Sequence, residues 1–240
     1  LNHGGPRDLF VRPVDGRGGP ANLTASWDLE PGNSSWSPDG RHLYFTAATG
    51  GESHLFRVAV PGAGAARAMP VARVEQVTTG ERRLNGLVID RGFTTIAYTV
   101  GVHDAPADVF AAKIDGTGER RLSNVHIAIK DDVVFGRTER LRWKSYDRTP
   151  FEGWITLPPG YDPARGPHPP VVVTHCGPHA ATGYAFDFKK QFFAANGYVV
   201  LDTNFRSSTG YGEAFKWATW GEWGRKDGED VVPGIDHVLR

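Results

Sequence analysis

The hydrophobic and polar positions divide the chain near residue 130. Before that point, short runs of β-branched and aromatic residues alternate with turns rich in Gly, Pro and Asp. No stretch there has the apolar stripe of an amphipathic helix, which recurs about every 3.6 residues. The first half is therefore expected to be all β, with strands at residues 8–14, 42–46, 54–60, 95–100 and 109–114.

Residues 36–40, Trp-Ser-Pro-Asp-Gly, predict a tight turn before the strand at 42–46. Pro38 presets φ at the second turn position, and Gly40 can adopt a positive φ. The turn and the strand after it predict a β-hairpin.

A short repeat extends through the first half. A Leu or Val followed by a hydroxyl residue ends a strand at Thr24, Thr78 and Ser123, which lie 54 and 45 residues apart. Propeller blades repeat every 40–50 residues or so, and a propeller needs about four blades to close. The spacing therefore predicts the C-terminal part of a longer propeller, about two and a half blades, over residues 1–125. An ordinary antiparallel sandwich with coincidental spacing is the alternative.

The second half alternates strands and helices. We expect strands at residues 141–145 and 151–157, joined by a polar turn through Asp147. The apolar runs at 170–174 and 198–201 are typical of strands buried on both faces. Between them, residues 186–196 have a helical pattern whose apolar stripe includes Phe188 and Phe192, and a last helix is expected at 228–240. Strand, helix and strand in this order predict a parallel βαβ unit.

Composition excludes several classes of protein. The 240 residues contain 27 Lys and Arg and 27 Asp and Glu, and this balance argues against a nucleic-acid binder that works by bulk charge. No apolar run approaches the roughly 20 residues of a membrane helix. The single cysteine, Cys176, excludes an internal disulfide and a Cys-based zinc cage, and the nine histidines follow no metal-binding motif. We therefore predict no metal site.

The candidate chemistry is concentrated in residues 174–179, Thr-His-Cys-Gly-Pro-His. This loop follows the apolar run at 170–174 and precedes the expected helix. Loops at the carboxyl ends of parallel strands are where α/β sheets bind ligands.

Four landmarks in order resemble the prolyl oligopeptidase family of serine peptidases, and most closely its acylaminoacyl-peptidase and dipeptidyl-peptidase-like branch. They are residues 175–179, residues 191–198, residues 204–212 (Asn-Phe-Arg-Ser-Ser-Thr-Gly-Tyr-Gly), and Trp223-Gly224 followed by Asp230. The resemblance implies that residues 141–240 are the N-terminal part of an α/β-hydrolase domain. Residues 126–140 would then be a linker after the propeller.

The resemblance also implies roles for single residues. In α/β-hydrolases, the loop after the third strand donates a backbone N–H to the oxyanion hole. The resemblance implies that the N–H of Gly177 has this role. The residues expected to line the pocket or to anchor its loops are His175, Cys176, His179, Arg206 and Tyr211. Short peptides are the implied substrates, no cofactor is implied, and a homo-oligomer is compatible with the sequence. Cys176 and Ser207 depart from the family pattern, which has glycine at both positions.

The catalytic triad is not expected within this chain. No Gly-x-Ser-x-Gly elbow occurs, so we expect the nucleophile to lie beyond Arg240 and the chain alone to be inactive. Because the first residue is Leu1, we also expect the native start to be missing, and compartment is not indicated beyond a slight preference for the cytoplasm.

Several alternatives stay open at this stage. The whole protein could be an esterase on the same fold, or a non-catalytic binding protein built on the propeller. Cys176 could be a nucleophile with His175 or His179 as its base. Arg206 is expected to anchor its loop, with Asp202 as one possible partner. Residues 2–6, Asn-His-Gly-Gly-Pro, resemble the 175–179 loop but are interpreted as a surface turn.

Overall fold

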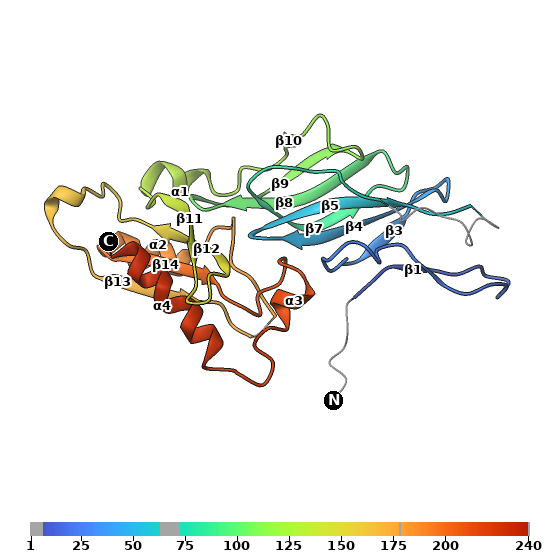
Figure 1. The fold of residues 1–240 in the computed structure, drawn as a ribbon. Coiled ribbons are helices and arrows are strands. Elements are labelled where there is room, and N and C mark those ends of the chain that lie inside the picture. The colour runs from blue at the N-terminus through green and yellow to red at the C-terminus, as the bar shows by residue number, and fades with distance from the viewer. Residues whose placement is uncertain (1–6, 63–72, 178, 240) are drawn as a thin grey trace.

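The computed structural model describes residues 7–62, 73–177 and 179–239. Antiparallel sheets occupy one end of the molecule, and a smaller α/β unit occupies the other (Figure 1). The strands of the first end are β1 (Phe10–Val11), β2 (Ala21–Asn22), β3 (Ser34–Trp36), β4 (His42–Thr49), β5 (Glu52–Ala59), β6 (Val74–Gln76), β7 (Arg83–Ile89), β8 (Thr95–Val102), β9 (Ala105–Lys113) and β10 (Arg120–Arg121). Residues 2–6 lie outside the described residues.

The first end of the chain is all β in its described part, as predicted, although the predicted strand at 8–14 is much shorter. It is reduced to β1 because Pro13 begins a turn, in which the Gly16 N–H donates to the Pro13 carbonyl at 3.1 Å. The turn at 36–40 is confirmed. Gly40 has φ +67°, its N–H donates to the Ser37 carbonyl at 2.9 Å, and β3 and β4 pair on either side.

Strands β3 to β10 form one sheet made of two antiparallel units, β3–β6 and β7–β10. A single parallel pair, Ser53 with Arg83, joins the two units. One apolar cluster, which includes Phe45, lies within the β3–β6 unit, and a second cluster packs Tyr44 and Leu55 of that unit against Ile96 of the other. The described sheet is therefore two four-stranded units placed side by side.

The three repeat positions make the same contact. In each, the hydroxyl of the strand-ending residue accepts a hydrogen bond from the backbone N–H of a partner segment: Leu9 to Thr24 at 3.0 Å, Leu55 to Thr78 at 2.9 Å, and Val109 to Ser123 at 2.9 Å. The sequence repeat thus corresponds to a structural repeat.

The α/β end contains α1 (Ile127–Asp132), β11 (Thr138–Lys144), β12 (Pro150–Thr156), a short 3₁₀ turn (Pro163–Arg165), β13 (Pro170–Thr174), α2 (Phe188–Ala195), β14 (Val199–Asn204), α3 (Glu213–Lys216) and α4 (Lys226–Val238). The sheet order is β11-β12-β14-β13, and only β13 and β14 are parallel. The predicted βαβ unit, β13-α2-β14, is confirmed. Helix α1 and the first residues of β11 fall within the segment expected to be a linker.

Burial of the two parallel strands differs from the prediction. Strand β14 is buried throughout, because β12 and β13 flank it. Strand β13, predicted to be buried on both faces, is only partly buried, because it forms one edge of the described sheet.

Helices α2 and α4 cover opposite faces of this sheet. Asp202 of β14 binds Lys190 of α2, whereas Trp143 of β11 packs against Gly234 of α4. Asp202 is paired with Trp154 of β12, while Trp143 contacts Gly153, the residue that precedes Trp154 in β12. Successive residues of a strand point to opposite faces, so the two helices lie on different sides.

The apolar stripe of α2 does not face the core. Phe188 and Phe192 are 73% and 54% exposed, whereas Lys190 and Gln191 are buried. Lys190 forms an ion pair with Asp202, and the Gln191 side-chain amide bonds both backbone groups of Gly136 at 2.8 and 3.1 Å. Polar pairing with the strands, rather than the apolar stripe, orients this helix.

The tip of the β4–β5 hairpin joins the two ends of the molecule. The Gly50 N–H donates to the Gly210 carbonyl at 2.7 Å, and the Tyr184 N–H donates to the Gly51 carbonyl at 3.0 Å. A Cβ on Gly51 would lie 2.2 Å from the Trp154 ring, so only glycine fits at this contact.

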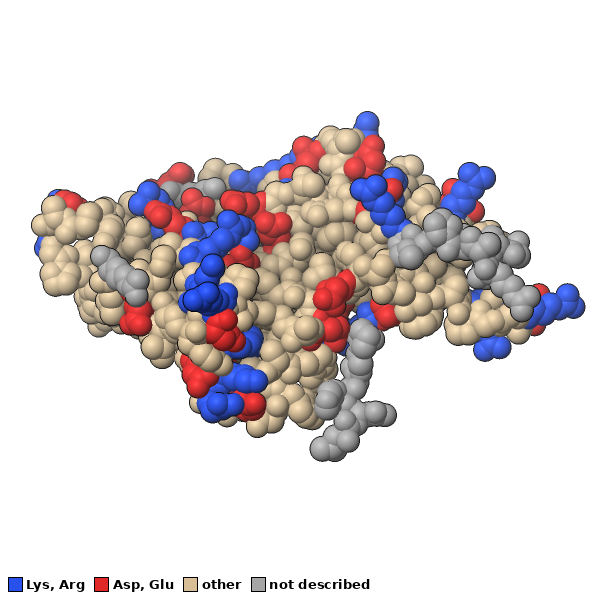
Figure 2. Space-filling view, in the orientation of Figure 1, with Lys and Arg blue, Asp and Glu red and all other residues tan. Residues whose placement is uncertain are grey.

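Charged side chains of both signs are interspersed over the face shown in Figure 2, with no continuous basic field. Within the described residues, no helix has the length and apolar character needed to cross a membrane. In the same part of the chain, no three His, Cys, Asp or Glu residues are grouped as metal ligands.

Candidate functional site

Two loops meet at the carboxyl ends of the parallel strands: the β13 loop (residues 175–177 and 179–183) and the β14 loop (residues 205–212). They are hydrogen-bonded to each other, because the Thr209 N–H donates to the Ala180 carbonyl at 2.9 Å. The Asn204 side chain also bonds both backbone groups of Thr182, at 2.8 and 3.0 Å. Each loop therefore holds the other in position.

Gly177 lies at the exposed turn of the β13 loop with φ +67°, a conformation that favours glycine. It lines an open pocket of about 330 Å³ whose other residues are Thr174, His175, Phe205, Trp223, Asp227, Gly228 and Val231. The candidate oxyanion loop thus borders a cavity between the β13 edge and the start of α4.

His175 and Ser208 lie within hydrogen-bond distance, with 2.8 Å between His175 Nε2 and Ser208 Oγ. The Ser208 hydroxyl donates to the Phe205 carbonyl at 2.7 Å, so His175 Nε2 must carry the proton that it shares with Ser208. A nucleophilic serine needs the reverse arrangement, in which histidine accepts the hydroxyl proton. Ser208 is also fully buried. This pair therefore holds the loops together and does not form a catalytic dyad.

The environment of His175 favours its neutral form. Its ring stacks on Phe205 with 4.4 Å between ring centroids. Burial lowers the pKa of His175 below the ordinary histidine value.

Cys176 is an exposed free thiol. The Nδ1 atom of His175 lies 3.5 Å from the Cys176 carbonyl oxygen. His179 directs Nδ1 at the Ser207 carbonyl, 3.3 Å away, and its ring packs edge-on against Trp217. Within the described residues, neither imidazole is hydrogen-bonded to the thiol.

Arg206 is buried and anchors the β14 loop. Its guanidinium contacts both carboxylate oxygens of Asp230, with Nε at 2.9 and 3.1 Å and Nη2 at 2.5 Å, and also Asp147 at 2.5 Å. Hydrogen bonding to Asp230 raises the pKa of Arg206 above its ordinary value. The suggested pairing of Arg206 with Asp202 was wrong, because Asp202 binds Lys190 on the other face of the sheet.

Ser207, the second departure from the family pattern, has φ +98° and is fully buried. That conformation favours glycine, and here a serine adopts it. The Ser207 hydroxyl contacts the Thr219 hydroxyl, which supplies a side-chain contact that glycine would lack.

Tyr211 belongs to a polar network beneath the loops. Its hydroxyl donates to Glu152 at 2.6 Å and accepts from the Asn204 amide at 2.6 Å, and Glu152 also binds Arg140. Burial first, and then the Glu152 carboxylate, raise the pKa of Tyr211. These hydrogen bonds anchor the end of the β14 loop, to which Tyr211 belongs.

The sequence did not point to Arg83. It projects from β7 and donates to the Ala181 carbonyl of the β13 loop at 2.8 Å. With His175 and Cys176 it lines a second pocket of about 280 Å³. Burial lowers the pKa of Arg83 below the ordinary arginine value. The contact joins residues 98 positions apart, so no local pattern could have indicated it.

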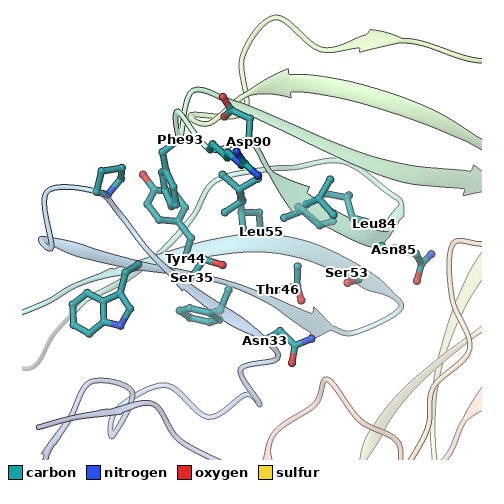
Figure 3. Close-up of a pocket in the computed structure, with 18 residues that line it drawn as sticks. Asn33, Ser35, Tyr44, Thr46, Ser53, Leu55, Leu84, Asn85, Asp90 and Phe93 are labelled. Atoms are coloured by element: carbon teal, nitrogen blue, oxygen red, sulfur yellow. The ribbon is translucent and has the colours of Figure 1, made fainter.

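A larger cavity, about 810 Å³, lies in the β end where the two four-stranded units diverge (Figure 3). Its lining includes Tyr44 and Leu55 of the β3–β6 unit, Leu84 of β7, and Phe93, which lies beside Tyr44. None of the site residues predicted from the sequence lines it. The single pair that joins the two units, at Ser53 and Arg83, accounts for the divergence.

Comparison with known proteins first defines the class of fold. The uncomplexed acylaminoacyl peptidase of Pyrococcus horikoshii superposes with a TM-score of 0.77 at 22% identity, over 97% of this chain and 34% of that one. The described part of the chain therefore has the fold of the corresponding part of an acylaminoacyl peptidase.

Sequence relatives give the family. Residues 184–240 match the prolyl oligopeptidase family model. Dipeptidyl aminopeptidase BIII of Pseudoxanthomonas mexicana is 35% identical over 101 residues, 40% of this chain and 15% of that protein. Dipeptidyl-peptidase 5 of Arthroderma otae is 27% identical over 239 residues, 97% of this chain and 31% of that protein. The chain is therefore similar to members of the prolyl oligopeptidase family, and it spans about a third or less of the length of these relatives.

Proposed function

We propose that this chain is part of a serine peptidase that cleaves short peptides, and that it supplies the oxyanion-hole loop. The observation that carries the proposal is the position of Gly177. It is exposed, has a positive φ, and borders a pocket at the carboxyl end of an edge strand. The dipeptidyl-peptidase relatives support peptides as the substrate class.

The proposed mechanism is acyl transfer. A serine on a strand paired with the open edge of β13 would attack the substrate carbonyl, with His and Asp assisting. The N–H of Gly177 would donate to the oxyanion that forms. His175, stacked on Phe205 and bonded to Ser208, and Arg206, paired with Asp230, would keep the loop in the required geometry. No residue of this chain is assigned to the triad.

In this proposal the domains follow the sequence prediction: residues 1–125 are part of a propeller, 126–140 a linker, and 141–240 part of an α/β-hydrolase domain. The repeated hydroxyl contact at Thr24, Thr78 and Ser123 and the two four-stranded units support the propeller. The propeller would restrict entry to short peptides.

The test compares cleavage of an acyl-amino-acid anilide and of a short acyl ester by the longer protein that contains this chain. We expect the anilide to be cleaved with the higher kcat/KM; faster turnover of the ester alone would favour an esterase. The C176G variant is the companion measurement. It should retain turnover within about twofold, because a backbone donor needs no side chain at the preceding residue. A hundredfold loss with intact folding would assign the chemistry to the thiol.

A further inference from the structure

Another cavity borders the β13 loop at His179. It has a volume of about 330 Å³ and is lined by His179, Lys216, Trp217, Thr219, Trp220 and Trp223. We call it the tryptophan pocket. Trp220 and Trp223 are 50% and 49% exposed, so two large aromatic side chains remain partly in water.

The walls of the tryptophan pocket are fixed by contacts with one another and with neighbouring residues. The indole N–H of Trp217 donates to Glu213 at 2.7 Å, and its ring packs against Trp220 with 5.5 Å between centroids. The Thr219 hydroxyl contacts Ser207, which belongs to the β14 loop. The pocket is therefore already formed in the protein without a ligand.

The one charged side chain lining the pocket is neutralised. Lys216 lies 5.1 Å from the centroid of the Trp217 ring and forms ion pairs with Glu30 at 2.6 Å and Glu213 at 3.1 Å. An acidic guest would compete with these two carboxylates, and a basic guest would meet the ammonium group. A neutral, flat, apolar group fits best, because aromatic rings pack on one another in edge-on and offset arrangements.

The pocket shares a wall with the pocket of Gly177. Trp223 lines both the tryptophan pocket and the pocket of Gly177, and His179 follows Gly177 by two residues. We propose that the tryptophan pocket receives one aromatic side chain of the peptide whose carbonyl lies at Gly177, and so sets a preference for aromatic residues. This inference rests on the proposed peptidase function.

The test is a binding measurement that needs no catalysis. The protein is titrated with acetyl-Ala-Phe-Ala-amide and with acetyl-Ala-Ala-Ala-amide, and tryptophan fluorescence is followed. The phenylalanine peptide should bind at least about tenfold more tightly, because burying one aromatic side chain is worth at least that factor. Equal affinities for the two peptides would overturn the proposal without any variant.

Variants locate the binding. W220A and W223A should each reduce the preference for phenylalanine to about twofold or less, while far-UV circular dichroism shows an unchanged fold. W36A is the matched control, since Trp36 is 52% exposed in β3, and it should leave the preference unchanged. A preference that survives both pocket variants, or that is lost in W36A, would contradict the assignment. If the longer protein proves catalytically inert and the preference is present, the peptidase proposal fails while the pocket stands.

Discussion

Arg206 and Asp230 form a buried bidentate ion pair that ties the loop after β14 to the first half of α4. The Arg206 backbone N–H donates to the same carboxylate at 3.0 Å. One aspartate thus fixes both the backbone and the side chain of the residue at the start of the candidate site.

Replacing Arg206 by methionine should lower the free energy of unfolding by about 3–5 kcal/mol, because Asp230 would remain as a buried charge without its partner. Urea unfolding followed by circular dichroism measures this. R17M is the control, since the Arg17 side chain is 91% exposed and lies 3.9 Å from Asp15. A loss below about 1 kcal/mol in R206M would mean that the pair does not hold the loop.

Replacing Gly51 by alanine should destabilise the protein by about 1–3 kcal/mol, because the new methyl group would lie 2.2 Å from the Trp154 ring. Thermal unfolding is a suitable measurement. G62A provides the comparison, since nothing lies within 4 Å of that Cβ position. Equal melting temperatures for the two variants would show that the hairpin tip is not packed as described.

Ser207 tests the cost of a positive φ at a residue other than glycine. S207G and S207A both lose the contact with Thr219, and only the glycine variant relieves the backbone. S207G should therefore be more stable than S207A by about 1–2 kcal/mol. The reverse order in chemical denaturation would contradict the left-handed conformation at this position.

His103 should make stability depend on pH. Burial first, and then the charge of Lys190, lower the pKa of His103, and its buried Nε2 has no hydrogen-bond partner within the described residues. The folded state therefore binds this proton less readily than the unfolded state. The contribution of neutral His103 to the free energy of unfolding is complete above about pH 6.5, and it is lost as the pH falls below that value. H103F should reduce the fall in unfolding free energy between pH 7 and pH 5; an unchanged slope would show that other groups cause it.

Local signals account for what the sequence predicted well. The turn at 36–40, the strand at 170–174 and the Gly-containing loop after it are each specified by a few neighbouring residues. The structure has a turn, β13 and, at residues 175–177 and 179, a loop in these places. The Thr and Ser repeat also depends on short strand endings.

Long-range pairing accounts for what the sequence missed. The apolar stripe of α2, which includes Phe188, is exposed, because the ion pair between Lys190 and Asp202 turns the other side of the helix inward. Arg83 approaches the candidate site from a strand almost a hundred residues earlier. Such contacts depend on how distant elements pack against each other. The hydrophobic periodicity of one segment carries no information about that packing.

The central claim is that this chain supplies an oxyanion-hole loop to a serine nucleophile that it does not itself contain. The most direct test is labelling with a fluorophosphonate, followed by peptide mass spectrometry, on the 240-residue chain and on the longer protein that contains it. We predict no label on the 240-residue chain, and in the longer protein a label on a serine within a Gly-x-Ser-x-Gly segment outside these residues. Labelling of Ser207 or Ser208, or an unlabelled longer protein whose turnover is abolished by a thiol alkylator, would contradict the account.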